Sequence, residues 1–314
     1  MTTQLFVERD RCPCCASRTL TKRYECGFDK SPIKEYLEGF YTPQGGVEFD
    51  YLHGAVYCLL QCGECGLIFQ RDIPSDGLME RLYEHWIDPS KALSLALESD
   101  SLTSRCFNAQ EIIQVIAYLN QKPCSLRFLD FGMGWGEWAL MAKGFGCDVY
   151  GAELSKARID HATSKGIKIL TGKESPAPRF DFINTEQVFE HLPSPLETLV
   201  ALKNQLKPGG LLKISVPSGW DIERRLRIMD WGCPKGTKNS LNLVAPLEHI
   251  NCFQVRSIEK MASLAGLKPV NIPLQIQCGF IVNCGGPARL GLHLAKQFYR
   301  ATSKKRCRLF LAVA

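Results

Sequence analysis

The sequence lacks the long apolar runs of a membrane protein. No stretch of its 314 residues approaches the ~20 consecutive apolar residues that a bilayer-spanning helix needs. The first residues also lack the basic and apolar regions of a secretory signal peptide. We therefore expect a cytoplasmic protein without a membrane span. In such a protein the 15 cysteines are expected to be free thiols or metal ligands rather than disulfides.

Acidic residues are missing from the end of the chain. No Asp or Glu follows Glu259, whereas nine of the 38 Lys and Arg residues do. Because the chain has 32 acidic residues, the first 259 residues carry a net charge of −3. This balance disfavours a broad nucleic-acid surface. Residues 286–314 are predicted to form a basic C-terminal helix packed on its own domain, with a membrane-surface or nucleic-acid helix as the alternative.

The dinucleotide-binding fingerprint is also incomplete. Residues 126–140 form an apolar run that ends on Asp130, followed by a glycine loop and a helical pattern, so they predict a strand, a tight turn and a helix. The loop holds three alternating glycines, Gly132, Gly134 and Gly136. The fingerprint G-x-G-x-x-G/A would need a small residue where Glu137 stands. A carboxylate at that position repels a pyrophosphate.

A second acid indicates which ligand the loop binds. Glu153 ends the next apolar run, about twenty residues after the glycines, where an acid is placed to hydrogen-bond a ribose diol. The two features together predict an adenosine ligand without phosphate and with a positive centre. S-adenosylmethionine fits this description.

Two further motifs support a family resemblance. Residues 180–192 and 206–217 resemble the fourth-strand and fifth-strand motifs of class I S-adenosylmethionine-dependent methyltransferases, and the resemblance covers residues 105–285. It implies a doubly wound, Rossmann-like α/β sheet. The cofactor contacts that it implies come from Asp130, Gly132, Gly134, Gly136, Glu153, Leu154, Asn184, Thr185, Glu186 and Gln187. Gly172 and Lys173 are further candidates beside the adenine.

Two cysteine knuckles near the N-terminus predict a structural zinc site. Each is a C-x-x-C pair: Cys12 with Cys15, and Cys62 with Cys65. Four thiolates can hold zinc tetrahedrally, and such a site leaves no open coordination position for chemistry. Cys14 is predicted to be a bystander, with Cys12–Cys14 pairing as the alternative.

The chain therefore divides into four predicted parts, the last of which is the basic C-terminal helix of residues 286–314. Residues 1–72 form the zinc-binding module with its insertion, and residues 73–124 a helical linker. Residues 125–285 form the methyltransferase core, because strands and helices alternate there as in a parallel sheet. Within the core, segment 217–247 is rich in Trp, Arg, Gly and Pro and is predicted to cap a pocket. Residues 268–283 are predicted to form a terminal hairpin.

Catalysis is predicted to involve histidines. Methyl transfer from a sulfonium needs the acceptor placed in line and, where necessary, deprotonated. His191 follows the fourth strand, and Glu248 and His249 follow the cap segment. Residues 248–253 resemble the E-H-x-x-x-F element of small-molecule and sugar methyltransferases. The resemblance places the corresponding Glu-His pair, with a histidine after the fourth strand, at the acceptor.

These observations predict S-adenosylmethionine-dependent methyl transfer, to carbon or oxygen, on a small molecule such as a sugar or a natural-product intermediate. The alternatives are methylation of a macromolecule, or a nucleic-acid- or protein-binding zinc module on an inert methyltransferase fold. A nucleotide-dependent oxidoreductase is disfavoured by Glu137.

Overall fold

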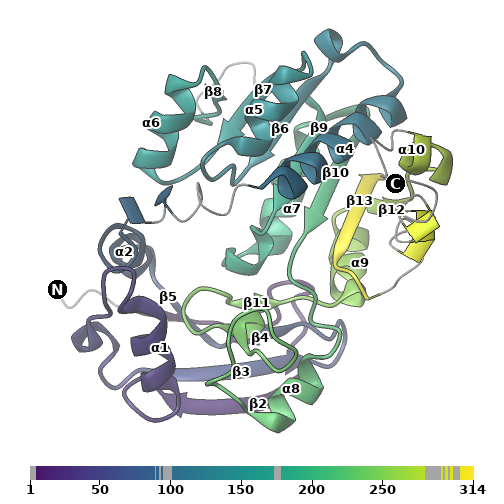
Figure 1. The fold of residues 1–314 in the computed structure, drawn as a ribbon. Coiled ribbons are helices and arrows are strands. Elements are labelled where there is room, and N and C mark those ends of the chain that lie inside the picture. The colour runs from purple at the N-terminus through teal and green to yellow at the C-terminus, as the bar shows by residue number, and fades with distance from the viewer. Residues whose placement is uncertain are drawn as a thin grey trace. The chain divides into compact units, whose positions relative to one another are not determined.

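Contacts divide the chain into two compact units. The computed structural model describes residues 5–88, 90–91, 93–94, 101–172, 178–279, 291–292, 294–295, 298–299 and 305–314. The N-terminal unit consists of Met1–Ser99, Phe189–Glu197 and Val216–Met261. The seven-strand unit consists of Asp100–Val188, Thr198–Ser215 and Ala262–Ala314 (Figure 1). Cap segment 217–247, which the sequence assigned to the core, therefore groups with the N-terminal module.

The seven-strand unit is built on one sheet with the strand order β12-β13-β10-β9-β6-β7-β8. Its strands are β6 (Arg127–Phe131), β7 (Asp148–Ala152), β8 (Lys168–Ile169), β9 (Phe180–Glu186), β10 (Leu206–Ser215), β12 (Leu267–Val270) and β13 (Arg308–Val313). The five strands from β8 to β10 pair in parallel. Because β6 lies between β7 and β9, the strand order reverses there. Ligands of such sheets bind at this switch point, outside the carboxyl ends of the strands.

Helices connect these strands. They are α4 (Leu102–Leu119), η3 (Pro123–Ser125), α5 (Glu137–Gly144), α6 (Lys156–Ser164), α7 (Pro195–Asn204), α9 (Val255–Leu264) and α10 (Leu274–Gly279). Side chains of α4, α5 and α6 pack with Phe128 and Phe182 of the sheet in one apolar core. Leu129 and Ile183, which follow them in the strands and point the opposite way, are also fully buried. The sheet is thus covered on both faces, as in a doubly wound fold.

The edge of this sheet differs from the sequence prediction. A terminal hairpin was expected within residues 268–283, but its described part contains helix α10 after β12. The partner of β12 is instead β13, at the end of the segment predicted as a basic helix. β13 pairs antiparallel with both β12 and β10 and buries Leu311. The prediction of helix through to residue 314 is therefore wrong for residues 308–313, and residues 280–290 lie outside the described ones.

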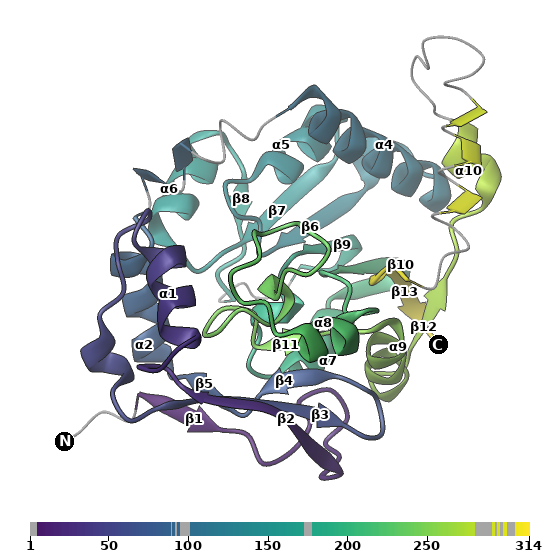
Figure 2. The same ribbon diagram turned by 60° about the horizontal axis from the view of Figure 1, so that its bottom comes forward.

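The N-terminal unit contains a four-stranded antiparallel sheet with the order β11-β4-β3-β2 (Figure 2). Its strands are β2 (Leu20–Gly27), β3 (Val56–Cys62), β4 (Ile68–Gln70) and β11 (Asn251–Cys252), and β1 (Phe6–Glu8) pairs with β5 (Asp72–Pro74). Its helices are α1 (Ile33–Tyr41), η1 (Phe49–Leu52), α2 (Asp76–Arg81), η2 (Leu82–Trp86), η4 (Phe189–His191), α8 (Ile222–Ile228) and η5 (Asn242–Val244). The cap segment thus contains a helix, α8, that its composition did not predict.

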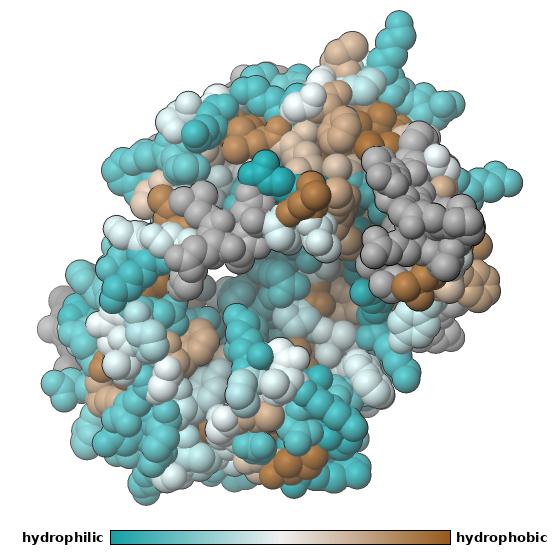
Figure 3. Space-filling model, in the orientation of Figure 1, coloured by the Kyte–Doolittle hydropathy of each residue, from teal (hydrophilic) through white to brown (hydrophobic). Residues whose placement is uncertain are grey.

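Aromatic residues dominate the core of this unit. Tyr57 and Trp231 meet edge to face at 5.7 Å, and Tyr41 meets Trp86 in the same way. In the view of Figure 3 the surface over α1 and α8 is mostly hydrophilic, with scattered hydrophobic residues. None of the described helices, in either unit, is long and apolar enough to cross a membrane.

Candidate functional site

The glycine loop lies at the switch point of the sheet, directly after β6. Gly132, Gly134 and Gly136 have φ values of +71°, +54° and +83°, in the left-handed region that favours glycine. A Cβ on Gly132 would lie 2.5 Å from Val188, so this position also needs a glycine for space. A Cβ on Gly134 would meet nothing within 4 Å. The loop therefore exposes its backbone to open space at Gly134.

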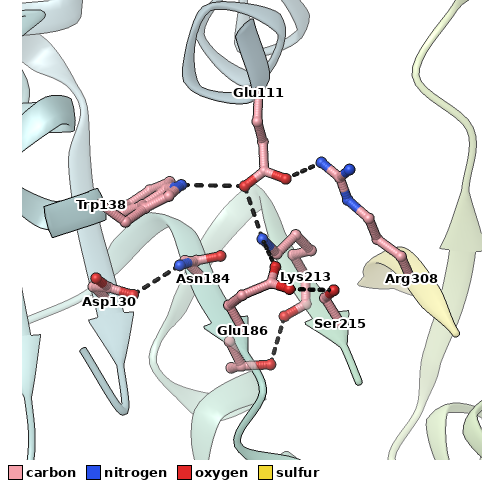
Figure 4. Close-up of polar contacts among 9 residues, drawn as sticks. Glu111, Asp130, Trp138, Asn184, Glu186, Lys213, Ser215 and Arg308 are labelled. Carbon is pink, nitrogen blue, oxygen red and sulfur yellow. Dashed lines mark hydrogen bonds and ion pairs between the residues drawn. The ribbon is translucent and has the colours of Figure 1, made fainter. Parts of the chain in front are cut away.

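A buried carboxylate stands at the end of β6. Asp130 Oδ1 accepts a hydrogen bond of 2.7 Å from the amide of Asn184, which lies on the neighbouring strand β9 (Figure 4). Burial raises the pKa of Asp130 to about 6, against the effects of Asn184 and the Lys213 ammonium. The carboxyl group beside the glycine loop therefore ionises less readily than an exposed Asp does, and a cationic ligand would stabilise its charged form.

Glu153 is fixed by the backbone around it. Its carboxylate accepts N–H groups from Gly134 at 3.0 Å, Leu154 at 2.8 Å and Ser155 at 3.1 Å. It thus holds the loop after β6 against the turn after β7. Leu154 beside it is 98% exposed. The Trp135 ring packs edge to face on His161, with ring centroids 5.5 Å apart.

The residues at the end of β9 divide between two environments. Thr185 is buried and donates its hydroxyl to the carbonyl of Lys213 at 2.7 Å. The side chain of Glu186 is 45% exposed, and its carboxylate accepts from Ser215 at 2.8 Å and Lys213 at 2.7 Å. Gln187 has a φ of +56° and donates its N–H to the Ser215 carbonyl at 2.8 Å. Gly172 adopts a φ of +76°, while Lys173 lies outside the described residues.

The three predicted catalytic residues lie together in the N-terminal unit. The rings of His191 and His249 meet edge to face, with centroids 5.0 Å apart. His191 Nδ1 lies 2.9 Å from the carbonyl oxygen of Glu248, and His249 Nδ1 bonds to the carbonyl of Asn242. The Glu248 carboxylate accepts a 2.9 Å hydrogen bond from Tyr41. Glu248 therefore orients His191 through its backbone, and its side chain serves a different partner.

Burial sets the charge of this group. Burial, together with a smaller effect of the neighbouring His191, lowers the pKa of His249 to about 3. Burial raises the pKa of Glu248, although the Tyr41 hydroxyl acts in the opposite direction. His249 is thus held as a neutral imidazole at neutral pH.

Two buried amides hold the segments that carry the histidines. Gln70, at the end of β4, donates to the carbonyls of Ala245 at 2.9 Å and His249 at 3.1 Å, and accepts from the Leu247 N–H at 3.2 Å. This clamp supports Leu247 in a left-handed conformation, with a φ of +72°. Asn251 donates to carbonyls of the η4 region, those of Phe189 at 3.1 Å and Leu192 at 2.7 Å.

The four predicted zinc ligands converge on one point. Cys12 Sγ lies 3.5 Å from Cys65 Sγ, and Cys15 Sγ lies 3.6 Å from Cys62 Sγ. All four sulfurs lie within 4.8 Å of one another. Zn–S bonds of ~2.3 Å in a tetrahedron separate the sulfurs by about 3.8 Å, close to these distances, whereas a disulfide would need ~2.05 Å. The Cys14 sulfur lies 3.7 Å from the Met261 sulfur, and its thiol also interacts with Cys65.

The part of the chain that contains the seven-strand sheet and the glycine loop was compared with known protein families. The family model described as "Methyltransferase domain" matches residues 101–272. The chain belongs to this methyltransferase family. The predicted doubly wound α/β fold is confirmed by the sheet order and by this match.

Similar proteins cover only part of the methyltransferase chain. The ubiquinone biosynthesis O-methyltransferase of Roseobacter denitrificans is 34% identical over 139 residues, which are 39% of this chain and 56% of the relative. A protein of the same name from Cereibacter sphaeroides is 32% identical over 162 residues, or 46% and 62%. The chain thus spans little more than half of these relatives. The plantazolicin methyltransferase BpumL, solved with SAH, is 17% identical with a TM-score of 0.48, and covers 74% of this chain and 93% of its own.

The methyltransferase domain contains a buried ionic network that sequence reasoning missed. Lys213, 1% exposed, donates to Glu111 of α4 at 2.7 Å as well as to Glu186 at 2.7 Å (Figure 4). Arg308 of β13 pairs with the other oxygen of Glu111, and Trp138 donates to Glu111 at 3.1 Å. A lysine within the apolar strand β10 was the available signal, because a buried charge needs partners. The partners themselves lie too far apart in the sequence to be found.

Each unit therefore gathers its own set of predicted residues. The seven-strand unit brings the cofactor residues to the carboxyl ends of β6, β7 and β9. Among these predicted cofactor residues, Thr185 has a buried side chain that donates its hydroxyl to the carbonyl of Lys213. The N-terminal unit gathers the two histidines in one place and the four cysteines in another. Sequence reasoning did not find Gln70, Asn251 or Glu190, a buried residue beside the histidines.

Proposed function

We propose that this protein is an S-adenosylmethionine-dependent methyltransferase that acts on a small molecule. The observation that carries the proposal is the use of the loop's backbone N–H groups. In dinucleotide-binding folds such groups bind the pyrophosphate. Here the Gly134 N–H donates to the Glu153 carboxylate, and the Gly132 and Met133 N–H groups donate to the carbonyl of Ala152. The loop backbone therefore offers few free donors for a phosphate.

This arrangement fits the chemistry of the cofactor. S-adenosylmethionine carries a sulfonium and an ammonium group and no phosphate, and it would supply an electrophilic methyl group. Asp130 would bind on its cationic side, and Glu153 would accept from the ribose hydroxyls with its remaining lone pairs. Gly134 leaves the space that a flat ligand needs beside the loop. Asn184, Glu186 and Gln187 complete the proposed contacts.

For the acceptor, we propose an oxygen nucleophile on a small molecule such as a sugar or a natural-product intermediate. The name of the curated relatives, ubiquinone biosynthesis O-methyltransferase, supports oxygen over carbon. The acceptor is activated at the histidine pair. Because both Nδ1 atoms lie against carbonyls and donate to them, Nε2 is the basic atom of each ring. His249 is too weak a base at its lowered pKa, so His191 takes the proton when no other activation is available.

We further propose that Cys12, Cys15, Cys62 and Cys65 hold one structural zinc ion. Their sulfur separations support tetrahedral ligation. Arg9 lies half-buried near the cluster, and its charge offsets part of the negative charge that four thiolates bring.

Calorimetry with S-adenosylmethionine tests the cofactor assignment. Replacing Glu153 with Gln keeps an amide oxygen for the loop but removes the charge-assisted bonds, so we expect affinity to fall by about 10- to 100-fold. Asp160→Asn, an exposed acid on α6, should leave affinity unchanged. If the protein does not bind S-adenosylmethionine but does bind a reduced nicotinamide cofactor, the result would point to an oxidoreductase instead. Labelled methyl transfer into small-molecule and macromolecular fractions of cell extract then identifies the acceptor.

A further inference from the structure

The N-terminal unit contains a second group of metal-type ligand atoms, separate from the four cysteines. One carboxylate oxygen of Glu190 and one ring nitrogen each of His191 and His249 lie within 4.8 Å of one another. His191 Nε2 lies 3.9 Å from Glu190 Oε1. Metal–nitrogen and metal–oxygen bonds of ~2.0–2.2 Å would require these side chains to draw in by about 1 Å, which small rotations allow.

The tautomers of the two histidines favour metal binding. A backbone carbonyl can only accept, so the carbonyls of Glu248 and Asn242 require a proton on the Nδ1 atoms of His191 and His249. The lone pair of each neutral ring is then on Nε2. This is the arrangement of metal-ligating histidines, whose other nitrogen donates to a carbonyl or carboxylate.

The three ligand groups lie together in a partly buried place. The Glu190 side chain is 2% exposed, and that of His191 is 27% exposed, so access remains on one side. A divalent cation between the carboxylate and the two imidazoles would attract all three groups at these distances.

The surrounding structure holds these ligands in place. Gln70 clamps the turn that carries His249, and Asn251 clamps the η4 segment that carries Glu190 and His191. Arg9 donates to the Asn251 side chain at 2.9 Å and so fixes the amide. Such outer contacts are what a preorganised site requires.

We propose that Glu190, His191 and His249 form a binding site for a divalent transition metal ion. Two imidazoles and one carboxylate suit zinc, iron, manganese, cobalt or nickel, and such a set leaves coordination positions open for a ligand. If the proposed function is correct, the ion would hold the acceptor oxygen and lower the pKa of its hydroxyl, so that the proton would pass to water and His191 would not be needed as the base. The binding claim itself does not rest on methyl transfer.

Cobalt titration of protein that has been loaded with only one zinc ion per chain, enough for the four cysteines, tests the site. One Co²⁺ per chain should bind with visible d–d absorption and without the thiolate charge-transfer bands of a cysteine site. His249→Gln and Glu190→Gln should each weaken binding by at least the ~10–100-fold that loss of an outer-shell partner costs. His53→Gln, an exposed histidine of the same unit, is the matched control and should bind normally.

The wild-type spectrum decides the matter even if the variants fold poorly. Absence of cobalt binding to zinc-loaded wild type, or unchanged affinity in a folded His249→Gln protein, would overturn the proposal in favour of a protonated His191 paired with Glu190. Calorimetry of S-adenosylmethionine reports on the other unit. Cobalt binding without cofactor binding would leave this site standing and remove the proposed function.

Discussion

Asp130 illustrates how a proposed cofactor-binding residue can reduce the stability of its own fold. Its folded pKa of about 6 lies above the ordinary value of 3.8, so the folded protein binds a proton more tightly than the unfolded chain does. Stability contributed by the protonated acid is therefore lost as the pH rises from about 4 to about 6. Above this window the ionised group costs on the order of 3 kcal/mol.

We expect Asp130→Asn to raise the free energy of unfolding at pH 7.5 by up to about 3 kcal/mol and to weaken S-adenosylmethionine binding. The gain should shrink at pH 4.5, and urea unfolding at both pH values measures it. Asp148→Asn is the control of opposite sign. Burial alone would raise the pKa of Asp148, but hydrogen bonds from Lys168 and Arg127 outweigh it and lower the pKa. A less stable Asp130→Asn protein at pH 7.5 would contradict the argument.

Single residues of the site were predictable where a local turn requires a particular residue type at a fixed spacing in the sequence. The three glycines alternate because three left-handed φ values occur in one tight turn, and this pattern is local in the sequence. The cysteine knuckles are local in the same sense. Glu190 lies within the fourth-strand motif, but the sequence does not single it out, because its proposed role depends on His249, which is 59 residues away in the sequence.

At the scale of elements, Lys213 joins a helix and two strands. Its ammonium bonds to Glu111 on α4 and Glu186 on β9, and Glu111 in turn pairs with Arg308 on β13. Lys213→Met removes the cation and leaves two carboxylates beside each other. We expect the free energy of unfolding to fall by about 3–5 kcal/mol, measured by urea denaturation.

A lysine in an exposed ion pair serves as the control that distinguishes the loss of the buried network from the loss of a positive charge in general. Lys156 pairs with Asp160 on α6, and both side chains are largely exposed. Lys156→Met should change stability far less, because solvent screens that pair. Equal effects from the two substitutions would mean that the buried network does not join these elements.

Helices and strands were predicted well where the hydrophobic periodicity of the sequence is strong. They were predicted poorly where pairing with a distant strand determines the structure. The strand–helix alternation of residues 126–216 gave β6, α5, β7 and β9 because buried parallel strands are apolar throughout. β13 was missed because its short apolar run follows a basic segment, and only pairing with β10 and β12 makes it a strand. α8 was missed because aromatic and proline residues on both sides hide its short helical pattern.

At the scale of the whole molecule, two ligand classes are proposed for two units. The proposed zinc ligands all lie in the N-terminal unit, and the proposed cofactor residues all lie in the seven-strand unit. A ligand that binds only the folded state stabilises the unit that contains its site. We therefore expect two calorimetric unfolding transitions, of which a chelator lowers one and S-adenosylmethionine raises the other.

Metal analysis accompanies this experiment. Cys62→Ser should lose about one zinc per chain and reproduce the effect of the chelator. Cys106→Ser, an exposed cysteine of α4, should retain the metal. A single transition that both ligands shift equally would show that the units unfold as one cooperative body.

The chain passes several times between the two units, and this limits which fragments of the gene can encode a complete unit. The chain changes unit at residues 99–100, 188–189, 197–198, 215–216 and 261–262. A gene fragment that ends at residue 72 encodes β2, β3 and β4, yet β11, which pairs with β4, is encoded 181 codons after Gln70. The cysteine-containing module is therefore not encoded by one continuous segment of the gene. Recombination that transfers it to another methyltransferase must also transfer the segment that follows β10.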